Sequence, residues 1–96
     1  LSVLARYHEI PFYPVAPNTT IDFECESGDA IPIEEREAYE VRGVRGSFGE
    51  VCWAPTNAPV RNPAFDVSPV DNVTAFICDK GIFSREMLKQ GALKYL

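Results

Sequence analysis

Basic residues and long apolar runs are scarce in this sequence, and both shortages exclude classes of protein. Nine Lys and Arg stand against fourteen Asp and Glu, which gives a formal net charge of -5. A nucleic-acid surface needs clustered cations, and a membrane-spanning helix needs a run of about 18 apolar residues. We therefore predict no nucleic-acid partner and no membrane partner. No basic-then-apolar leader is visible, which favours the cytoplasm, with the nucleus as an alternative in a eukaryote.

Cysteine and histidine are also too few and too dispersed to form a recognisable site. Cys25, Cys52 and Cys78 lie 27 and 26 residues apart, which fits no zinc or redox motif. An odd, dispersed set of cysteines is typical of reduced thiols in a cytosolic chain. The one histidine, His8, has no accompanying Cys or Ser motif, so a capping or surface role is favoured over catalysis. We predict no metal site.

What the sequence does contain is a pattern of alternating helices and strands. Ser2–Glu9 has apolar residues at helical spacing. Two further helices are predicted, one beginning after Ser68 and one after Ser84, each with a serine as its N-cap. Strands are predicted over three segments: Ile10–Ala16, Ile21–Cys25 and Glu50–Ala54. The first is apolar throughout, as a strand buried on both faces would be, and the second alternates apolar with polar residues.

Two polar stretches in the middle of the chain can be interpreted either as exposed surface segments or as sites of chemistry. Glu34–Glu37 reads as one exposed helical turn, and adjacent glutamates point to different sides of a helix, so they cannot easily share a substrate. The glycines of Arg42–Gly49 recur every three residues with arginines between them. A phosphate-cradling loop is one interpretation. The spacing does not fit the dinucleotide or P-loop patterns, so a flexible surface loop is favoured.

The most informative stretch is Arg61–Pro69. Pro63 forces its predecessor Asn62 towards extended backbone. Ser68, with Pro69 at the first helical position and Asp71 three residues after the cap, has the pattern of a helix start. A strand end, a polar pair and a helix start therefore meet here, which is where ligand pockets form in open α/β folds.

These elements together predict the α/β class. The order of helix, strand, irregular β segment, strand, helix, helix fits the second half of a Rossmann-like domain. We expect a parallel sheet with helices on its faces and an irregular β excursion. Because residues 1–8 have the pattern of a helix end, we expect residues 1–96 to be part of a larger protein.

Four stretches of the chain, which together with the residues between them run from about Ser2 to Phe83, resemble the methylthioribose-1-phosphate isomerase family. They are Ile10-Pro11-Phe12-Tyr13 leading to Val15-Ala16-Pro17, Ser27–Arg36, Asn62–Pro69, and Asp79-Lys80-Gly81-Ile82. The first is shared loosely with regulatory subunits of the translation-initiation nucleotide-exchange factor and with ribose bisphosphate isomerases. The segment Ile33–Arg36, with the preceding Ser27-Gly28-Asp29, is more particular to the methylthioribose branch.

The resemblance implies a fold and an activity. It implies the C-terminal part of a Rossmann-like domain over residues 1–96, with the N-terminal domain and the first half of the catalytic domain outside this chain. It implies a homodimer that needs no cofactor or metal. The reaction would convert 5-methylthioribose 1-phosphate to 5-methylthioribulose 1-phosphate in methionine salvage. The family's catalytic cysteine and aspartate lie upstream, so no catalytic residue is assigned here, and the 96 residues alone are predicted to be inactive.

Substrate-binding residues are predicted from position alone. Asn62, Asp66 and Asp22 lie at the predicted ends of strands and are candidates for the pocket. The alternative for Asn62 and Asp66 is that they only stabilise the turn.

A non-catalytic regulatory subunit is the second functional hypothesis. It keeps the fold and acts through protein–protein contacts, and the tail Leu93–Leu96 is similar to the C-terminus of those subunits. Isomerisation of ribose 1,5-bisphosphate is a third. Two departures from the isomerase pattern are Pro14 after Tyr13, and the region Arg42–Gly49.

Overall fold

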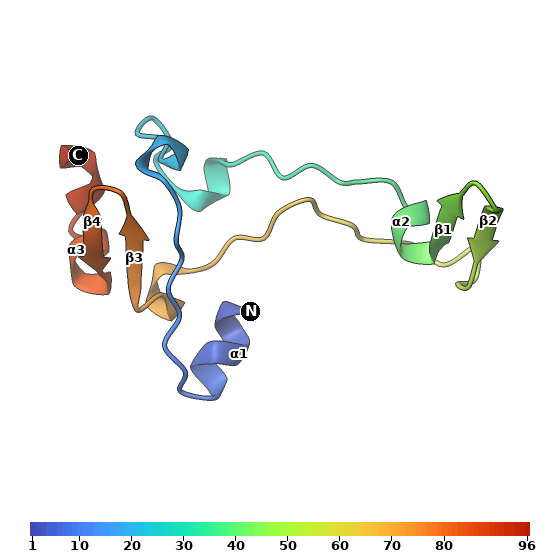
Figure 1. Ribbon diagram of the computed structural model, residues 1–96, viewed down its shortest axis with the longest axis horizontal. Coiled ribbons are helices and arrows are strands. Elements are labelled where there is room, and N and C mark those ends of the chain that lie inside the picture. Colours follow the sequence, from blue (N-terminus) through green and yellow to red (C-terminus); the bar gives the residue numbers. More distant parts are fainter. The chain divides into compact units, whose positions relative to one another are not determined.

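The computed structural model describes residues 1–96, which divide into two compact units (Figure 1). Unit 1 comprises Leu1–Ala30 and Val67–Leu96, and unit 2 comprises Ile31–Asp66. Helices and strands occur in both units, so the chain is of the α/β class. None of its helices has the length and apolar character needed to cross a membrane.

Unit 1 is built around a hairpin of β3 (Ala75–Cys78) and β4 (Gly81–Ser84). The strands are antiparallel, with Ala75 opposite Ser84 and Cys78 opposite Gly81. The helices of this unit are α1 (Ser2–Tyr7) and α3 (Arg85–Lys89). Short 3-10 helices complete it: Asn18–Thr20, Gly28–Ala30, Val70–Asn72 and Ala92–Tyr95. The most buried apolar side chains are Val73, Ala75 and Phe83.

The predicted strand Ile10–Ala16 is extended and runs parallel to β3. The amides of Thr74 and Ile77 donate to the carbonyls of Phe12 and Pro14 at 2.8 and 3.0 Å, and the Ala16 amide donates to the Ile77 carbonyl at 3.1 Å. A parallel bridge pairs Val15 with Ile77. Pro14 is tolerated in this pairing because only its carbonyl takes part, as an acceptor, and no backbone N–H is needed at this position.

The prediction of a helix beginning after Ser68 is wrong. A single 3-10 turn, Val70–Asn72, is followed after two residues by β3, and no side chain caps the turn. The run from Val73 to Ile77 is mostly apolar and rich in β-branched residues, and such a short run fits either a helix or a strand. The run forms a strand because its backbone pairs with the segment 12–16 and with β4.

Two further predictions in unit 1 are corrected. Ile21–Cys25 forms no strand, because the Cys25 amide turns back to the Asp22 carbonyl at 3.4 Å. The last helix does begin at Ser84, whose Oγ accepts from the Met87 amide at 3.3 Å. It stops at Lys89, however, because Gly91 takes left-handed backbone with φ 74°. Such a glycine ends a helix at little cost.

Unit 2 contains α2 (Tyr39–Arg42), β1 (Gly43–Gly46) and β2 (Gly49–Cys52). β1 and β2 form an antiparallel hairpin, so the predicted flexible loop over Arg42–Gly49 is wrong, whereas the predicted strand at Glu50 is confirmed within a residue or two. Gly49 has a φ of 103°, which gives the turn the positive angle that L residues rarely adopt. The helical turn predicted over Glu34–Glu37 is also wrong, since Glu35 is extended and bridges to Pro63.

Candidate functional site

Asn62 and Asp66, two of the three predicted substrate-binding residues, lie in one segment of unit 2. The Asn62 amide nitrogen donates to the Glu37 carbonyl at 3.1 Å and to the Glu40 carboxylate at 3.0 Å. Its backbone N–H donates to Glu35 Oε2 at 2.8 Å. Every hydrogen-bond donor of Asn62 is therefore used within unit 2.

Asp66 has a different environment from Asn62. Its side chain is exposed and makes no hydrogen bond or ion pair with the rest of the chain, and the preceding Phe65 is 69% exposed. Asp22, the third predicted residue, lies in unit 1. Its Oδ1 accepts from the Glu24 backbone N–H at 2.9 Å, which is a local Asx turn.

The side chains around Asn62 form an ionic network that the sequence only partly revealed. Glu35 Oε1 accepts from Arg61 at 2.7 Å, and Arg36 donates twice to Glu40 at 2.9 and 2.7 Å. The Arg36–Glu40 pair was readable from its i,i+4 spacing. The Glu35–Arg61 pair joins residues 26 apart and had no local signal.

Both acidic members of this network have lowered pKa values. The Asn62 backbone N–H, followed by the Arg61 guanidinium, lowers the pKa of the Glu35 carboxyl. The Arg36 guanidinium, followed by the Asn62 amide, lowers the pKa of the Glu40 carboxyl. A depressed carboxyl pKa stabilises the folded state above the ordinary value of 4.5, and this contribution is lost as the pH falls through the lowered value. The network is therefore complete at neutral pH.

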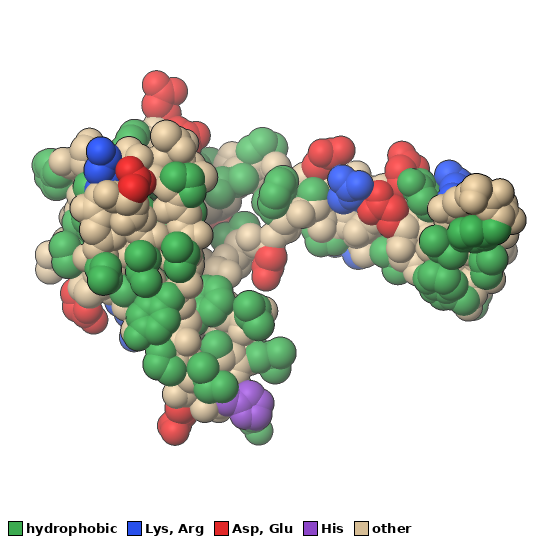
Figure 2. Space-filling model, viewed as in Figure 1, with side chains coloured by type: hydrophobic (Ala, Val, Ile, Leu, Met, Phe, Trp, Pro, Cys, Tyr) green, Lys and Arg blue, Asp and Glu red, His purple; other side chains and the backbone are tan.

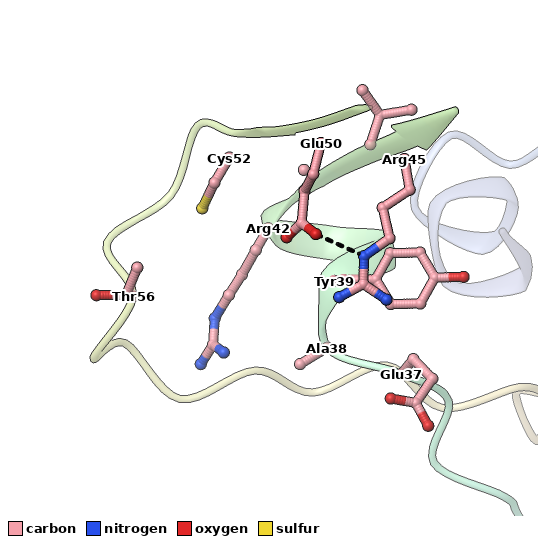
Figure 3. Close-up of a pocket in the computed structure, with 10 residues that line it drawn as sticks. Glu37, Ala38, Tyr39, Arg42, Arg45, Glu50, Cys52 and Thr56 are labelled. Atoms are coloured by element: carbon pink, nitrogen blue, oxygen red, sulfur yellow. Dashed lines mark hydrogen bonds and ion pairs between the residues drawn. The ribbon is translucent and has the colours of Figure 1, made fainter. Parts of the chain in front are cut away.

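One cavity lies in unit 2, beside the hairpin, and has a volume of about 340 Å³ (Figure 3). The Arg45 guanidinium lies over the Tyr39 ring, 4.0 Å from its centre, and donates to Glu50 at 2.8 Å. Arg42 donates to the Ala58 carbonyl, and its buried Nε has no partner. Both glycine-flanked arginines thus stabilise the hairpin and its neighbouring loop, and no phosphate-cradling loop forms.

A second cavity, of about 250 Å³, lies in unit 1 between α1 and the segment before β3. Arg6 donates to Asn72 at 3.1 Å, and Arg85 donates to the Val73 carbonyl at 2.7 Å. Asp71, which also lines it, forms an ion pair with Lys89, and this pair lowers the pKa of the Asp71 carboxyl. The lining carries both signs of charge. No group of three or more His, Cys, Asp and Glu side chains is placed to hold a metal ion.

The sequence of these elements matches one family model. The Initiation factor 2 subunit family is matched over residues 1–85. The chain belongs to this family. Within it, the chain is 54% identical over 94 residues to a methylthioribose-1-phosphate isomerase of Enterobacter sp. (strain 638), and 53% identical over 94 residues to one of Citrobacter koseri. Both matches cover 98% of this chain and 28% of the relative, so the chain spans little more than a quarter of the length of these curated relatives.

Two solved structures of the family have the same fold. The 5-methylthioribose 1-phosphate isomerase from Pyrococcus horikoshii OT3 matches with a TM-score of 0.75 and 43% identity, over 96% of this chain and 25% of that one. The translation initiation factor eIF-2B subunit delta from A. fulgidus matches with a TM-score of 0.77 and 35% identity, over 99% and 27%. The backbone likeness is therefore nearly the same for these two structures, and the higher sequence identities belong to the isomerases.

Proposed function

We propose that this chain is part of a methylthioribose-1-phosphate isomerase, which converts 5-methylthioribose 1-phosphate to 5-methylthioribulose 1-phosphate in methionine salvage. The observation that carries the proposal is the identity of 54% over 98% of the chain to a relative of that name. The resemblance of Ser27–Arg36 to the methylthioribose branch supports the same assignment.

The proposed reaction has a specific chemical difficulty. The anomeric carbon of the substrate carries phosphate, so its ring cannot open by the usual route of a free sugar. A general acid must protonate the ring oxygen as the ring opens, and hydrogen then moves between C1 and C2 in a site closed to water. We assign these steps to the catalytic cysteine and aspartate of the remainder of the protein, because no residue here matches their motifs.

Residues 1–96 would then supply the C-terminal part of a Rossmann-like domain that walls the pocket. The parallel pairing of the segment 12–16 with β3 supports a parallel sheet completed by the remainder of the same protein. Asn62, Asp66 and Asp22 stay our candidates for substrate contacts. We further propose a cytoplasmic homodimer that uses no cofactor.

The test is an isomerase assay of the full-length protein that contains this sequence. We expect turnover of 5-methylthioribose 1-phosphate, and no comparable turnover of ribose 1,5-bisphosphate. Turnover of the bisphosphate alone would reassign the substrate. Turnover of neither sugar, with stable binding to initiation-factor subunits, would replace the enzyme by a regulatory subunit, the branch that matches here at 35% identity.

A further inference from the structure

The two segments that enter and leave the hairpin of unit 2 are joined in a short two-stranded element, which we call the neck (Glu34–Glu37 and Arg61–Ala64). The Arg36 N–H donates to the Asn62 carbonyl and the Ala64 N–H to the Glu34 carbonyl, both at 2.8 Å. The reciprocal bonds of a full antiparallel ladder, from the Asn62 N–H to the Arg36 carbonyl and from the Glu34 N–H to the Ala64 carbonyl, are not formed. Side chains supply the remaining contacts of the neck.

The Glu35 carboxylate accepts from the Asn62 backbone N–H, which the ladder leaves unpaired, and from the Arg61 side chain. One oxygen accepts from Arg61 at 2.7 Å and the other from the Asn62 backbone N–H at 2.8 Å. Glu40, held by two hydrogen bonds from Arg36, accepts from the Asn62 side-chain amide at 3.0 Å. Two carboxylates therefore fix the backbone and the side chain of Asn62.

This arrangement decides which polar groups of the segment remain free. The amide nitrogen of Asn62 has two hydrogens, and both are used, by the Glu37 carbonyl and by Glu40. The Asn62 Oδ1 accepts no hydrogen bond, and the Asp66 carboxylate is exposed without a partner. The free polar groups of both side chains are acceptors, which suit the hydroxyl groups of a sugar and repel phosphate.

We propose that Glu35 and Glu40 are positioning residues for sugar binding, which act by committing the donors of Asn62 to the neck and leaving Asn62 Oδ1 and the Asp66 carboxylate as acceptors for substrate hydroxyl groups. The inference rests on the proposed isomerase function. It assigns the hydroxyl-bearing part of the substrate to this segment and the phosphate to other residues of the enzyme.

The first test concerns the neck and does not depend on activity. Glu35→Ala in the full-length protein is compared with Glu34→Ala, because the Glu34 side chain is exposed and makes no hydrogen bond or ion pair. We expect hydrogen exchange of peptides that cover 34–37 and 61–64 to accelerate about tenfold in Glu35→Ala and to stay unchanged in the control. Equal exchange in the two variants would overturn the role of Glu35 in the neck.

The second test measures steady-state kinetics with 5-methylthioribose 1-phosphate. Glu35→Ala, Glu40→Ala and Asp66→Asn should each raise KM about tenfold with kcat within about twofold, because hydroxyl contacts are present in both ground and transition states. Glu40→Gln keeps an acceptor for Asn62 and should recover most of the loss. The double variant Glu40→Ala/Asn62→Ala should be no worse than Asn62→Ala alone, because Glu40 acts through Asn62.

The outcomes separate this inference from the proposed function. An active wild-type enzyme whose Glu35→Ala and Glu40→Ala variants match Glu34→Ala would overturn the inference and leave the function standing. Additive losses in the double variant would show that Glu40 does not act through Asn62 and would also overturn it. An inactive wild-type protein would overturn the function and, with it, the sugar-binding role of the segment.

Discussion

At the scale of single residues, two serines with similar sequence signals have different roles. Both Ser68 and Ser84 have the sequence pattern of a helix N-cap, but only Ser84 accepts a hydrogen bond from the first turn of a helix. The sequence around Ser68 satisfies the local rule for a helix start, with proline next and an acidic residue third. Pairing of the following residues with β4 and with the segment 12–16 overrides that local signal. The sequence therefore predicted that serines can cap helices here, but tertiary contacts determined which of the two serines does so.

These two serines allow a matched prediction. Ser84→Ala removes the acceptor of the Met87 N–H and should lower the free energy of unfolding of the full-length protein by about 1 kcal/mol. Ser68→Ala removes no capping hydrogen bond and should change it by less than about 0.5 kcal/mol. Urea unfolding followed by circular dichroism measures both variants. Equal losses in both would contradict the assignment of the cap.

At the scale of elements, the sequence was more informative for segments with clear periodicity than for segments with special backbone. The helix at Ser2 and the strand at Glu50 were predicted correctly. The first strand and the turn of the hairpin, which fall within Arg42–Gly49, were taken for a loop, because glycines at regular spacing are typical of loops. In the structure, Gly43 is a strand residue whose missing side chain lets the facing strand approach. Such a close approach has no signature in a single sequence.

Gly43 and Gly46 lead to the element-scale prediction. A Cβ at Gly43 would lie 1.9 Å from the Val51 carbonyl oxygen, a backbone atom that cannot move away without separating the strands. Gly43→Ala should therefore destabilise the hairpin locally by about 1–3 kcal/mol, the range for overpacking. Hydrogen exchange of the peptide 43–52 in the full-length protein should accelerate, because the destabilised hairpin opens more often.

Gly46→Ala is the control for that experiment. Its Cβ would meet only the ring of Phe48, at 2.5 Å, and this side chain is 67% exposed and free to turn aside. We expect the exchange of peptide 43–52 to change little in Gly46→Ala. Equal acceleration in both variants would contradict the prediction, because it would mean that the close approach of the strands does not explain why a side chain at Gly43 is destabilising.

At the scale of the whole molecule, the distribution of apolar side chains connects the sequence to the proposed larger enzyme. The strand Ile10–Ala16 was predicted to be buried on both faces, yet Val15 is 71% exposed. Apolar side chains are exposed on α1 and on the β1–β2 hairpin as well (Figure 2). In the proposed larger enzyme, these side chains would be buried by a larger sheet, whereas within residues 1–96 they are only partly covered. The predicted pocket has the same limit, because Asn62, Asp66 and Asp22 were predicted from their position alone and no catalytic residue is assigned within residues 1–96.

This incomplete cover predicts the behaviour of the isolated 96-residue chain. Only three apolar side chains, Val73, Ala75 and Phe83, are buried, and a two-stranded hairpin is marginal in water without further packing. We expect the isolated chain to show no cooperative thermal transition by calorimetry and to bind a hydrophobic dye at 25 °C, whereas the full-length protein unfolds cooperatively and excludes the dye. We also expect the isolated chain to lack isomerase activity. A sharp transition of the isolated chain would contradict this expectation, because it would show that the chain folds cooperatively with its apolar faces uncovered.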